Sequence, residues 1–334
     1  LKNSSVVNGC DGILLRTNSR VEIAGNLFAN NHYCIQATGN VQLLGEGVSR
    51  NTFDGENSTF SCSISGSRWA IILDNVPQIT IGNSTGEPNF FKAYDGINVL
   101  NTNVDILNSK FKYWPTGTAI RLIGDDGVYT AQITGLGNTA VDTPFVEHYS
   151  SGISTRNYHL TVTDALFKTI TTRPIRINAS TLPARLDISE NRFEDFGSNA
   201  IQVEISAFEM ADISDNEFHD GSSVDFGDRA GIRWIDNQLV GSGNDAQAKF
   251  TGNKFYDNEK TSPDPDELYF RTHGIWLTSA SRVLMGFNEF YRNYESTIKH
   301  EFKGIWLSNS SKNEMIGNDN IGGTIEPQTV IDNR

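Results

Sequence analysis

Asp-Ile-Ser-Glu-Asn-Arg-Phe occupies residues 187–193, and Asp-Ile-Ser-Asp-Asn-Glu-Phe occupies residues 212–218. The second stretch begins 25 residues after the first, with its aliphatic, Asn and Phe positions unchanged. A block that recurs in this way indicates stacked copies of one structural unit. A further short strand at residues 199–203 lies between the copies. We therefore expect a fold built from repeated short strands.

Two columns of strands extend from this stretch along the chain. The first column centres on isoleucines at Ile13, Ile35, Ile71, Ile97, Ile120, Ile153, Ile175, Ile201, Ile232, Ile275 and Ile305. The second column consists of buried-polar-buried triplets that begin at Val21, Val41, Ile79, Val104, Leu160, Leu186, Ala211, Ala248 and Val283. Such alternation is typical of a strand with one buried face.

A phenylalanine follows many of these triplets, five residues after the last aliphatic position. These residues are Phe28, Phe111, Phe167, Phe193, Phe218, Phe255 and Phe290. An asparagine often stands two residues before the Phe, at Asn26, Asn191, Asn216, Asn253 and Asn288. We expect the rings to stack in the interior and the amides to form hydrogen-bonded ladders at the bends.

No helix-length periodic segment separates the strands, which excludes βαβ units. The repeated Gly-Ile and Ile-x-x-Asn-x-Phe units, such as Gly12-Ile13 with residues 23–28, resemble the right-handed parallel β-helix superfamily, with the pectate-lyase-like fold, across nearly all the chain. The resemblance implies an all-β fold, with residues 1–334 as a single right-handed parallel β-helix domain of about eleven turns with irregular loop insertions. At roughly 4.8 Å per turn the rod would be about 50 Å long.

Composition restricts the function classes. The chain has 334 residues, with 40 acids against 27 bases and a net charge of −13, which argues against general nucleic-acid binding. No apolar run reaches the roughly 18 residues that a membrane helix needs, so we expect no membrane insertion. No signal peptide is visible, and the sequence begins in the middle of a repeat. The acidic net charge leads us to expect an extracellular or cell-surface protein. The start within a repeat leads us to expect that this chain is an excerpt of a longer surface or secreted protein.

The three cysteines leave the redox compartment open. Cys10 and Cys34 are separated by about one repeat, so stacking could bring them together, and Cys34 with Cys62 is the other plausible pair. An odd count leaves at least one thiol unpaired within the chain. Buried apolar thiols are an equally good interpretation.

Alternation places a row of cations and two indoles on the outward face of the first column. We expect Arg121, Arg156, Arg176, Arg233, Trp276 and Trp306 to bind ligand. Guanidinium groups grip carboxylates and indoles stack on sugar rings, so an extended, anionic polysaccharide would suit this face. The structural alternative is that Arg233 lies on Trp276 as a cation–π pair, with both indoles beneath a loop at residues 256–272.

Extra residues predict further loops at 45–68, 124–130, 137–150, 221–229 and 236–247, and loops that leave a rigid coil often wall a groove. Polygalacturonases of the superfamily carry Asn-Thr-Asp, Asp-Asp, His-Gly and Arg-Ile-Lys on successive turns. This chain has Asn101-Thr102-Asn103, Asp125-Asp126, His148 and Arg176-Ile177-Asn178 in that order. The resemblance makes Asp125, Asp126 and His148 catalytic candidates. Three positions depart from the pattern: Asn103 replaces Asp, Tyr149 follows His148, and Asn178 replaces Lys.

The sequence gives less support for a lyase, an epimerase or a metal site. A lyase would need a cation and a base beside the uronate, and the signature of alginate epimerases is absent. We expect no metal site and no cofactor, although Ca²⁺ is possible where Asp215, Asp220, Asp225 and Asp228 lie near Glu217 and His219. Loose acidic spacing is more often solvated.

The sequence therefore favours a β-helix module for surface recognition or adhesion. Its expected partner is a polysaccharide or a neighbouring protein domain. The alternative is a polysaccharide lyase or glycoside hydrolase that acts on an acidic polysaccharide.

Overall fold

The structure is a computed structural model of the whole chain, and it describes the following residues: 1–55, 69–84, 87–92, 94–135, 145–178, 181–204, 206–219, 221, 229–239, 248–256, 270–291, 300–310, 313–321 and 330–331. These residues form strands and no helix. Consequently none of them lies in a helix that could cross a membrane. By its internal contacts the chain divides into an N-terminal unit, Leu1–Leu166, and a C-terminal unit, Phe167–Arg334.

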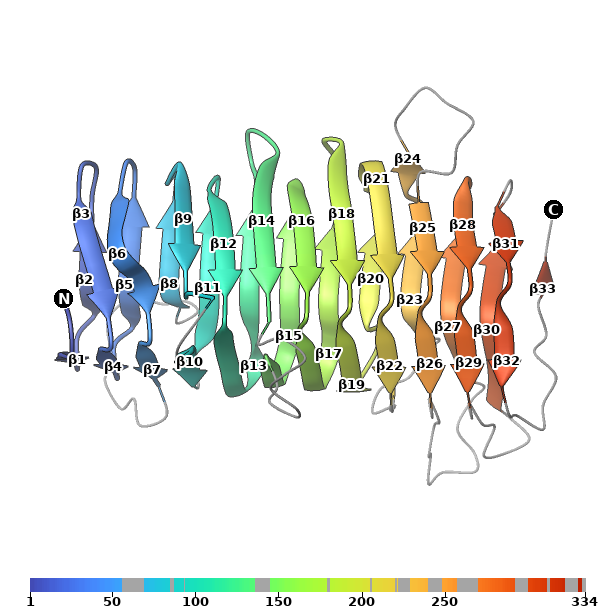
Figure 1. The fold of residues 1–334 in the computed structure, drawn as a ribbon, viewed down its shortest axis with the longest axis horizontal. Helices are drawn as coiled ribbons and strands as arrows, with labels where there is room; N and C mark the ends of the chain where they lie inside the picture. Colours follow the sequence, from blue (N-terminus) through green and yellow to red (C-terminus); the bar gives the residue numbers. More distant parts are fainter. Residues whose placement is uncertain are drawn as a thin grey trace. The chain divides into compact units, whose positions relative to one another are not determined.

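Within the N-terminal unit, strands succeed one another in three positions of each repeat (Figure 1). The isoleucine strands are β2 (Asp11–Leu15), β5 (Tyr33–Thr38), β8 (Trp69–Asp74), β11 (Asp95–Leu100), β13 (Ser109–Ile123) and β15 (Val146–Arg156). The phenylalanine strands are β1 (Ser5–Val7), β4 (Leu27–Ala29), β7 (Thr52–Asp54) and β10 (Asn89–Lys92), which leads to the start of β13. The second sheet contains β3 (Arg20–Ala24), β6 (Gln42–Ser49), β9 (Gln78–Ile81), β12 (Asn103–Leu107), β14 (Tyr129–Thr134) and β16 (Tyr158–Thr163).

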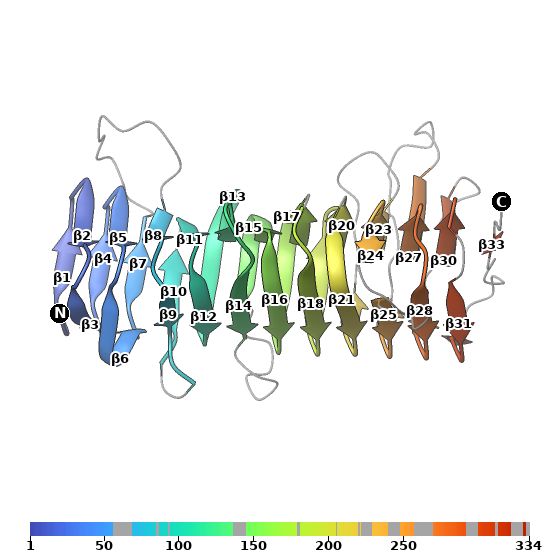
Figure 2. The same ribbon diagram turned by 90° about the horizontal axis from the view of Figure 1, so that it is seen from above.

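The C-terminal unit repeats this plan (Figure 2). Its isoleucine strands are β17 (Leu166–Asn178), β20 (Ile201–Glu204), β23 (Arg229–Ile235), β27 (Phe270–Thr278), β30 (His300–Ser308) and β33 (Val330–Ile331). Its phenylalanine strands are β19 (Arg192–Phe196), β22 (Glu217–His219), β26 (Lys254–Tyr256), β29 (Glu289–Tyr291) and β32 (Asp319–Ile321). Its second sheet contains β18 (Ala184–Ser189), β21 (Ala207–Ser214), β25 (Ala248–Thr251), β28 (Val283–Gly286) and β31 (Glu314–Ile316), with β24 (Gln238–Leu239) beside β21.

The strand pairs are parallel, and each links a strand to its counterpart in the next repeat, as in a β-helix-like solenoid. The expected isoleucine register is confirmed inside each unit. In the N-terminal unit it runs through Ile13, Ile35, Ile71, Ile97, Ile120 and Ile153. In the C-terminal unit it runs through Ile175, Ile201, Ile232, Ile275 and Ile305.

The phenylalanine stacks are confirmed as the centre of the core. Ring centroids lie 4.5–5.1 Å apart along Phe28, Phe53, Phe91 and Phe111. They lie 4.7–5.1 Å apart along Phe167, Phe193, Phe218, Phe255 and Phe290. The spacing matches the rise between neighbouring strands, so the strand ladder dictates how the rings stack.

Asparagine ladders hold the bend before each phenylalanine, as expected. In the C-terminal unit, Asn191 donates through its backbone N and Nδ2 to Oδ1 of Asn216 at 3.0 and 3.1 Å. The pattern continues through Asn216, Asn253, Asn288 and Asn318. Each Nδ2 also caps a backbone carbonyl, as Asn253 Nδ2 does for Ile213 O at 2.8 Å. The buried amides therefore satisfy backbone groups that the turn leaves unpaired.

Two expected positions on the second sheet are wrong. Ile23 registers with Val48 rather than with the Val41 triplet, because β6 contains an insertion with a register shift. The strand β14 begins at the end of the expected loop 124–130, and its Ala131, which was not assigned to the second column, registers with Val104 and Leu160. Strands also occupy parts of the expected loops 45–68 and 137–150, whereas most of 221–229, 236–247 and 256–272 lies outside the described residues.

The expected cysteine pairs are also wrong. Cys10 is disulfide-bonded, whereas Cys34 is a free, buried thiol. Burial raises the pKa of the Cys34 thiol to about 12. Cys62 lies outside the described residues.

We expect Phe218→Ala to lower the free energy of unfolding by about 3–5 kcal/mol, because the ring is fully buried between two others. The matched control is Phe287→Ala, since Phe287 is 65% exposed and its loss should cost roughly 0.5 kcal/mol or less. Urea unfolding of both variants measures the difference. Equal losses would show that the ring stack is wrong.

We expect Asn253→Ala to destabilise the C-terminal unit without removing apolar surface. The change leaves the carbonyl of Ile213 and the N–H of Asn216 without their partner amide. Each buried group left in this way costs about 1–3 kcal/mol. Hydrogen exchange should show faster exchange of the amides in β22 and β26 than in the unaltered chain, and unchanged exchange there would contradict the ladder.

Candidate functional site

Three arginines of the C-terminal unit, Arg173 and Arg176 of β17 and Arg233 of β23, lie on either side of Gln202. On the isoleucine strands, Arg176 registers with Gln202, and Gln202 with Arg233. Arg173 donates through Nε to the buried Gln202 Oε1, and Arg233 Nη1 lies 4.0 Å from Glu204 Oε1. Among the described residues, these three guanidinium groups and the Glu204 carboxylate leave a local excess of positive charge in a strongly acidic protein.

Arg173 and Arg176 are both partly buried within this cluster. Burial, followed by repulsion from Arg176, lowers the pKa of Arg173, although an arginine remains charged at neutral pH. The Arg176 Nε is buried and has no hydrogen-bond partner within the described part of the chain.

Two stacked indoles continue the same outward column. Arg233 registers with Trp276, and Trp276 with Trp306. The indole rings lie 4.7 Å apart at 21°, and the Arg233 guanidinium carbon lies 4.4 Å from the Trp276 ring centroid. His273 contacts both rings, at 5.7 and 4.6 Å between centroids. The cation–π pair predicted as the structural alternative is therefore present.

This packing assigns different surroundings to the two indoles. Trp276 is buried at 9% exposure, between Arg233 on the preceding strand and Trp306 on the following strand. Trp306 is half-buried and registers with Val330 of β33 on its other side. An indole with both faces covered cannot stack on a sugar ring, which excludes Trp276 from that role. Most of the loop predicted to cover the indoles, residues 256–272, lies outside the described residues.

The remaining predicted ligand-binding residues belong to the N-terminal unit. Arg121 is exposed and registers with Asn98 and Ser154. Arg156 is also exposed and forms an ion pair with Asp125. The prediction that all six residues line one surface stays a prediction.

The catalytic candidates have local structural partners. Asp125 accepts a hydrogen bond from Arg156, and its own N–H donates to Asn101 Oδ1 at 2.8 Å. Asp126 accepts one from the Tyr129 hydroxyl at 2.5 Å. That bond, which favours the neutral phenol, raises the pKa of Tyr129 to about 12. Both carboxylates thus stabilise the turn that follows β13.

The structure describes the other positions of the polygalacturonase-like pattern only in part. Asn103 Oδ1 accepts from Thr130 N at 2.8 Å, and its Nδ2 donates to Pro77 O at 3.1 Å, so it bridges neighbouring repeats. The His148 side chain lies outside the described residues, and Arg176 with Asn178 belong to the other unit.

No described group of three His, Cys, Asp or Glu residues could hold a metal ion. Of the residues named for Ca²⁺, Glu217 contacts His219 at 3.6 Å, and the hydrogen bond from His219 lowers the pKa of Glu217. Asp215 is exposed, while Asp220, Asp225 and Asp228 lie outside the described residues.

Arg173 and His273 were missed as members of the candidate site. Both stand two residues before a buried isoleucine, Ile175 and Ile275 respectively, and His273 registers with Ala230. The positions two residues before each buried isoleucine form a third column of the repeat. The sequence analysis did not predict this column because its residues vary in type from turn to turn.

Comparisons with known proteins add no relative. No model of a protein family matches the chain, and neither a curated protein nor a solved structure matches it.

Proposed function

We propose that this chain is an extracellular recognition or adhesion module that binds an anionic polysaccharide along its isoleucine strands. In this proposal the chain folds as one right-handed parallel β-helix of about eleven turns. The observation that carries it is the set of Arg173, Arg176 and Arg233 on the isoleucine strands, of which Arg233 contacts Glu204, next to stacked indoles. Guanidinium groups are well suited to carboxylates, and aromatic surface is suited to a sugar ring.

Each residue has a distinct part in the proposal. Arg173 and Arg176 supply charge, and the half-buried Trp306 supplies aromatic surface. Arg233 and Trp276 support Trp306 through their cation–π contact and the indole stack. Strands stacked at about 4.8 Å would present these groups at a regular spacing to an extended chain.

The disulfide bond at Cys10 supports an extracellular location, because disulfides persist in oxidising compartments.

We expect oligogalacturonate to bind more tightly than neutral cello-oligosaccharide, and the preference should shrink as salt rises from about 0.05 to 0.5 M. Arg176→Ala should weaken oligogalacturonate binding about tenfold and leave neutral chains unchanged, because it removes only charge-dependent contacts. Trp306→Ala should weaken both. Isothermal titration calorimetry measures all three effects.

The matched control is Arg185→Ala. Arg185 is an exposed arginine of the same unit, paired with Glu209 on the second sheet, so its loss should leave binding unchanged. Equal weakening by Arg185→Ala would show attraction by overall charge rather than by the cluster. Shortened chains, or new unsaturated ends that absorb in the ultraviolet, would replace the recognition proposal by a hydrolase or a lyase.

A further inference from the structure

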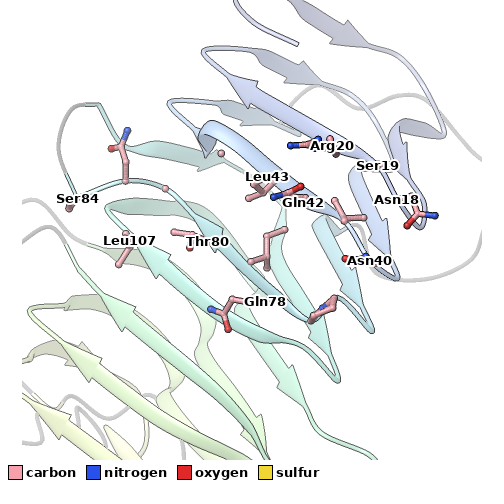
Figure 3. Close-up of a pocket in the computed structure, with 16 residues that line it drawn as sticks. Asn18, Ser19, Arg20, Asn40, Gln42, Leu43, Gln78, Thr80, Ser84 and Leu107 are labelled. Atoms are coloured by element: carbon pink, nitrogen blue, oxygen red, sulfur yellow. The ribbon is translucent and has the colours of Figure 1, made fainter.

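The second sheet is interrupted in the N-terminal unit. A slot of about 930 Å³ lies beside β9 (Figure 3), where the described register between β6 and β9 is the single pair of Val48 with Ile81. The side chains of the inserted residues 44–46 lie outside the described residues, so the slot does not define a ligand. In the C-terminal unit, by contrast, β25, β28 and β31 keep a continuous register, and the outward side chains of these three strands are all described.

An apolar patch lies on the outward face of these strands. Phe287, which directly follows β28, is 65% exposed, and Ile316 of β31 is 42% exposed. Leu284 of β28 is half-buried beside them. Ile316 registers with Gly286, which has no side chain to cover its neighbours. Contiguous exposed apolar surface of this kind marks an interaction site.

The backbone of Phe287 is strained. Its φ is 54°, in the left-handed region that bulky residues rarely adopt. The corresponding turn residues of the same unit, which also have positive φ, are Glu190, Asp215, Gly252 and Gly317, so Phe287 is the one apolar side chain of this column. A Cβ on Gly317 would lie 2.8 Å from the Phe287 ring, so the glycine makes room for the ring. Strain of this kind points to a role for the exposed ring.

Opposite charges flank the patch. Lys249 of β25, Leu284 of β28 and Glu314 of β31 are registered neighbours. Lys249 and Glu314 are exposed, and they are the charged residues of these three strands. Within the described part of the chain, neither side chain forms an ion pair. The face therefore has an apolar centre with a cation on one side and an anion on the other.

We propose that this face binds a second copy of the chain in a two-fold symmetric dimer. A two-fold axis that runs along β28 places Lys249 of each copy opposite Glu314 of the other. The same axis brings the two Leu284 side chains together, and likewise the two Phe287 rings. The face is thus self-complementary, as a two-fold interface requires. A uniformly acidic or basic partner would meet one matched and one opposed charge, so the pattern favours the second copy.

The size of the face limits the strength of the dimer. Three neighbouring strands form a smaller face than the roughly 800 Å² per partner of a standard interface. Arg282, which precedes β28 and is half-buried, also lies near the axis and opposes association by facing its counterpart. We therefore expect a weak, reversible dimer with a Kd on the order of 10–100 µM. The dimer does not depend on the proposed polysaccharide site, which lies on the isoleucine strands.

Sedimentation equilibrium of the full chain, from about 1 to 500 µM, measures the association. The average mass should rise from that of one chain toward that of two. Phe287→Ser should abolish the rise, because it removes the apolar centre. The matched control is Met210→Ser on β21 of the same sheet, since Met210 is 48% exposed but lies outside the patch. A monomer at every concentration, or equal effects of the two substitutions, would overturn the proposal.

Exchange of the two charges tests the symmetry. Lys249→Glu alone and Glu314→Lys alone should each weaken self-association about tenfold, because like charges then meet across the axis. A mixture of these two variants should form mixed dimers, since both contacts then join opposite charges, and the double variant should associate like the unaltered chain. Circular dichroism shows whether each variant keeps its strands. A mixture that associates no more tightly than either variant alone would contradict the two-fold arrangement.

The exposed ring also allows a test against a sugar platform. Cello-oligosaccharide is titrated into the unaltered chain and into Phe287→Ser. We expect no binding that depends on Phe287. Binding that Phe287→Ser abolishes, in a chain that stays monomeric, would identify a sugar platform and overturn the dimer.

Discussion

Parallel stacking of like side chains at the spacing of neighbouring strands is the constraint on which the structure depends. The phenylalanine rings lie 4.5–5.1 Å apart because the backbone ladder sets that distance. The asparagine amides bond at the same rise and cap carbonyls that each bend would otherwise leave unpaired. A buried amide must have such partners, so the ladders also fix where each repeat turns.

The same register determines what the surface presents. Once Ile201 stacks on Ile232, Gln202 must lie beside Arg233 on the outer face, and the next repeats bring Trp276 and Trp306 into line. Insertions are the feature that still differs from one repeat to the next. The extra residues of β6 leave the ladder intact at Val48 and Ile81 but separate the strands beside it. The function that we propose therefore uses an outward column of the ladder.

Sequence reasoning recovered what stacking makes periodic. The isoleucine register and most of the phenylalanine stack were predictable because each copy must match its neighbour. Phe53 and Phe91 were missed because insertions precede them, although Asn51 and Asn89 stand two residues before them and carry the signal. The β14 strand was missed although its triplet, which starts at Ala131, has the same form as the predicted triplets at Ala211 and Ala248. The contacts of Arg173 and Asp125, and the slot beside β9, could not be predicted because they depend on three-dimensional packing around bends and insertions.

Disulfide trapping tests the register most directly. In a background that carries Cys34→Ala, Asp187→Cys with Asp212→Cys joins two outward positions that are registered partners on neighbouring strands. Their spacing of about 4.8 Å suits a disulfide. In the control pair, Asp187→Cys with Met210→Cys, the second cysteine is two residues out of register, since Met210 pairs with Arg185. Mass spectrometry after mild oxidation should find the bond mainly in the first pair. Equal or faster bonding in the second pair would contradict the stacked register.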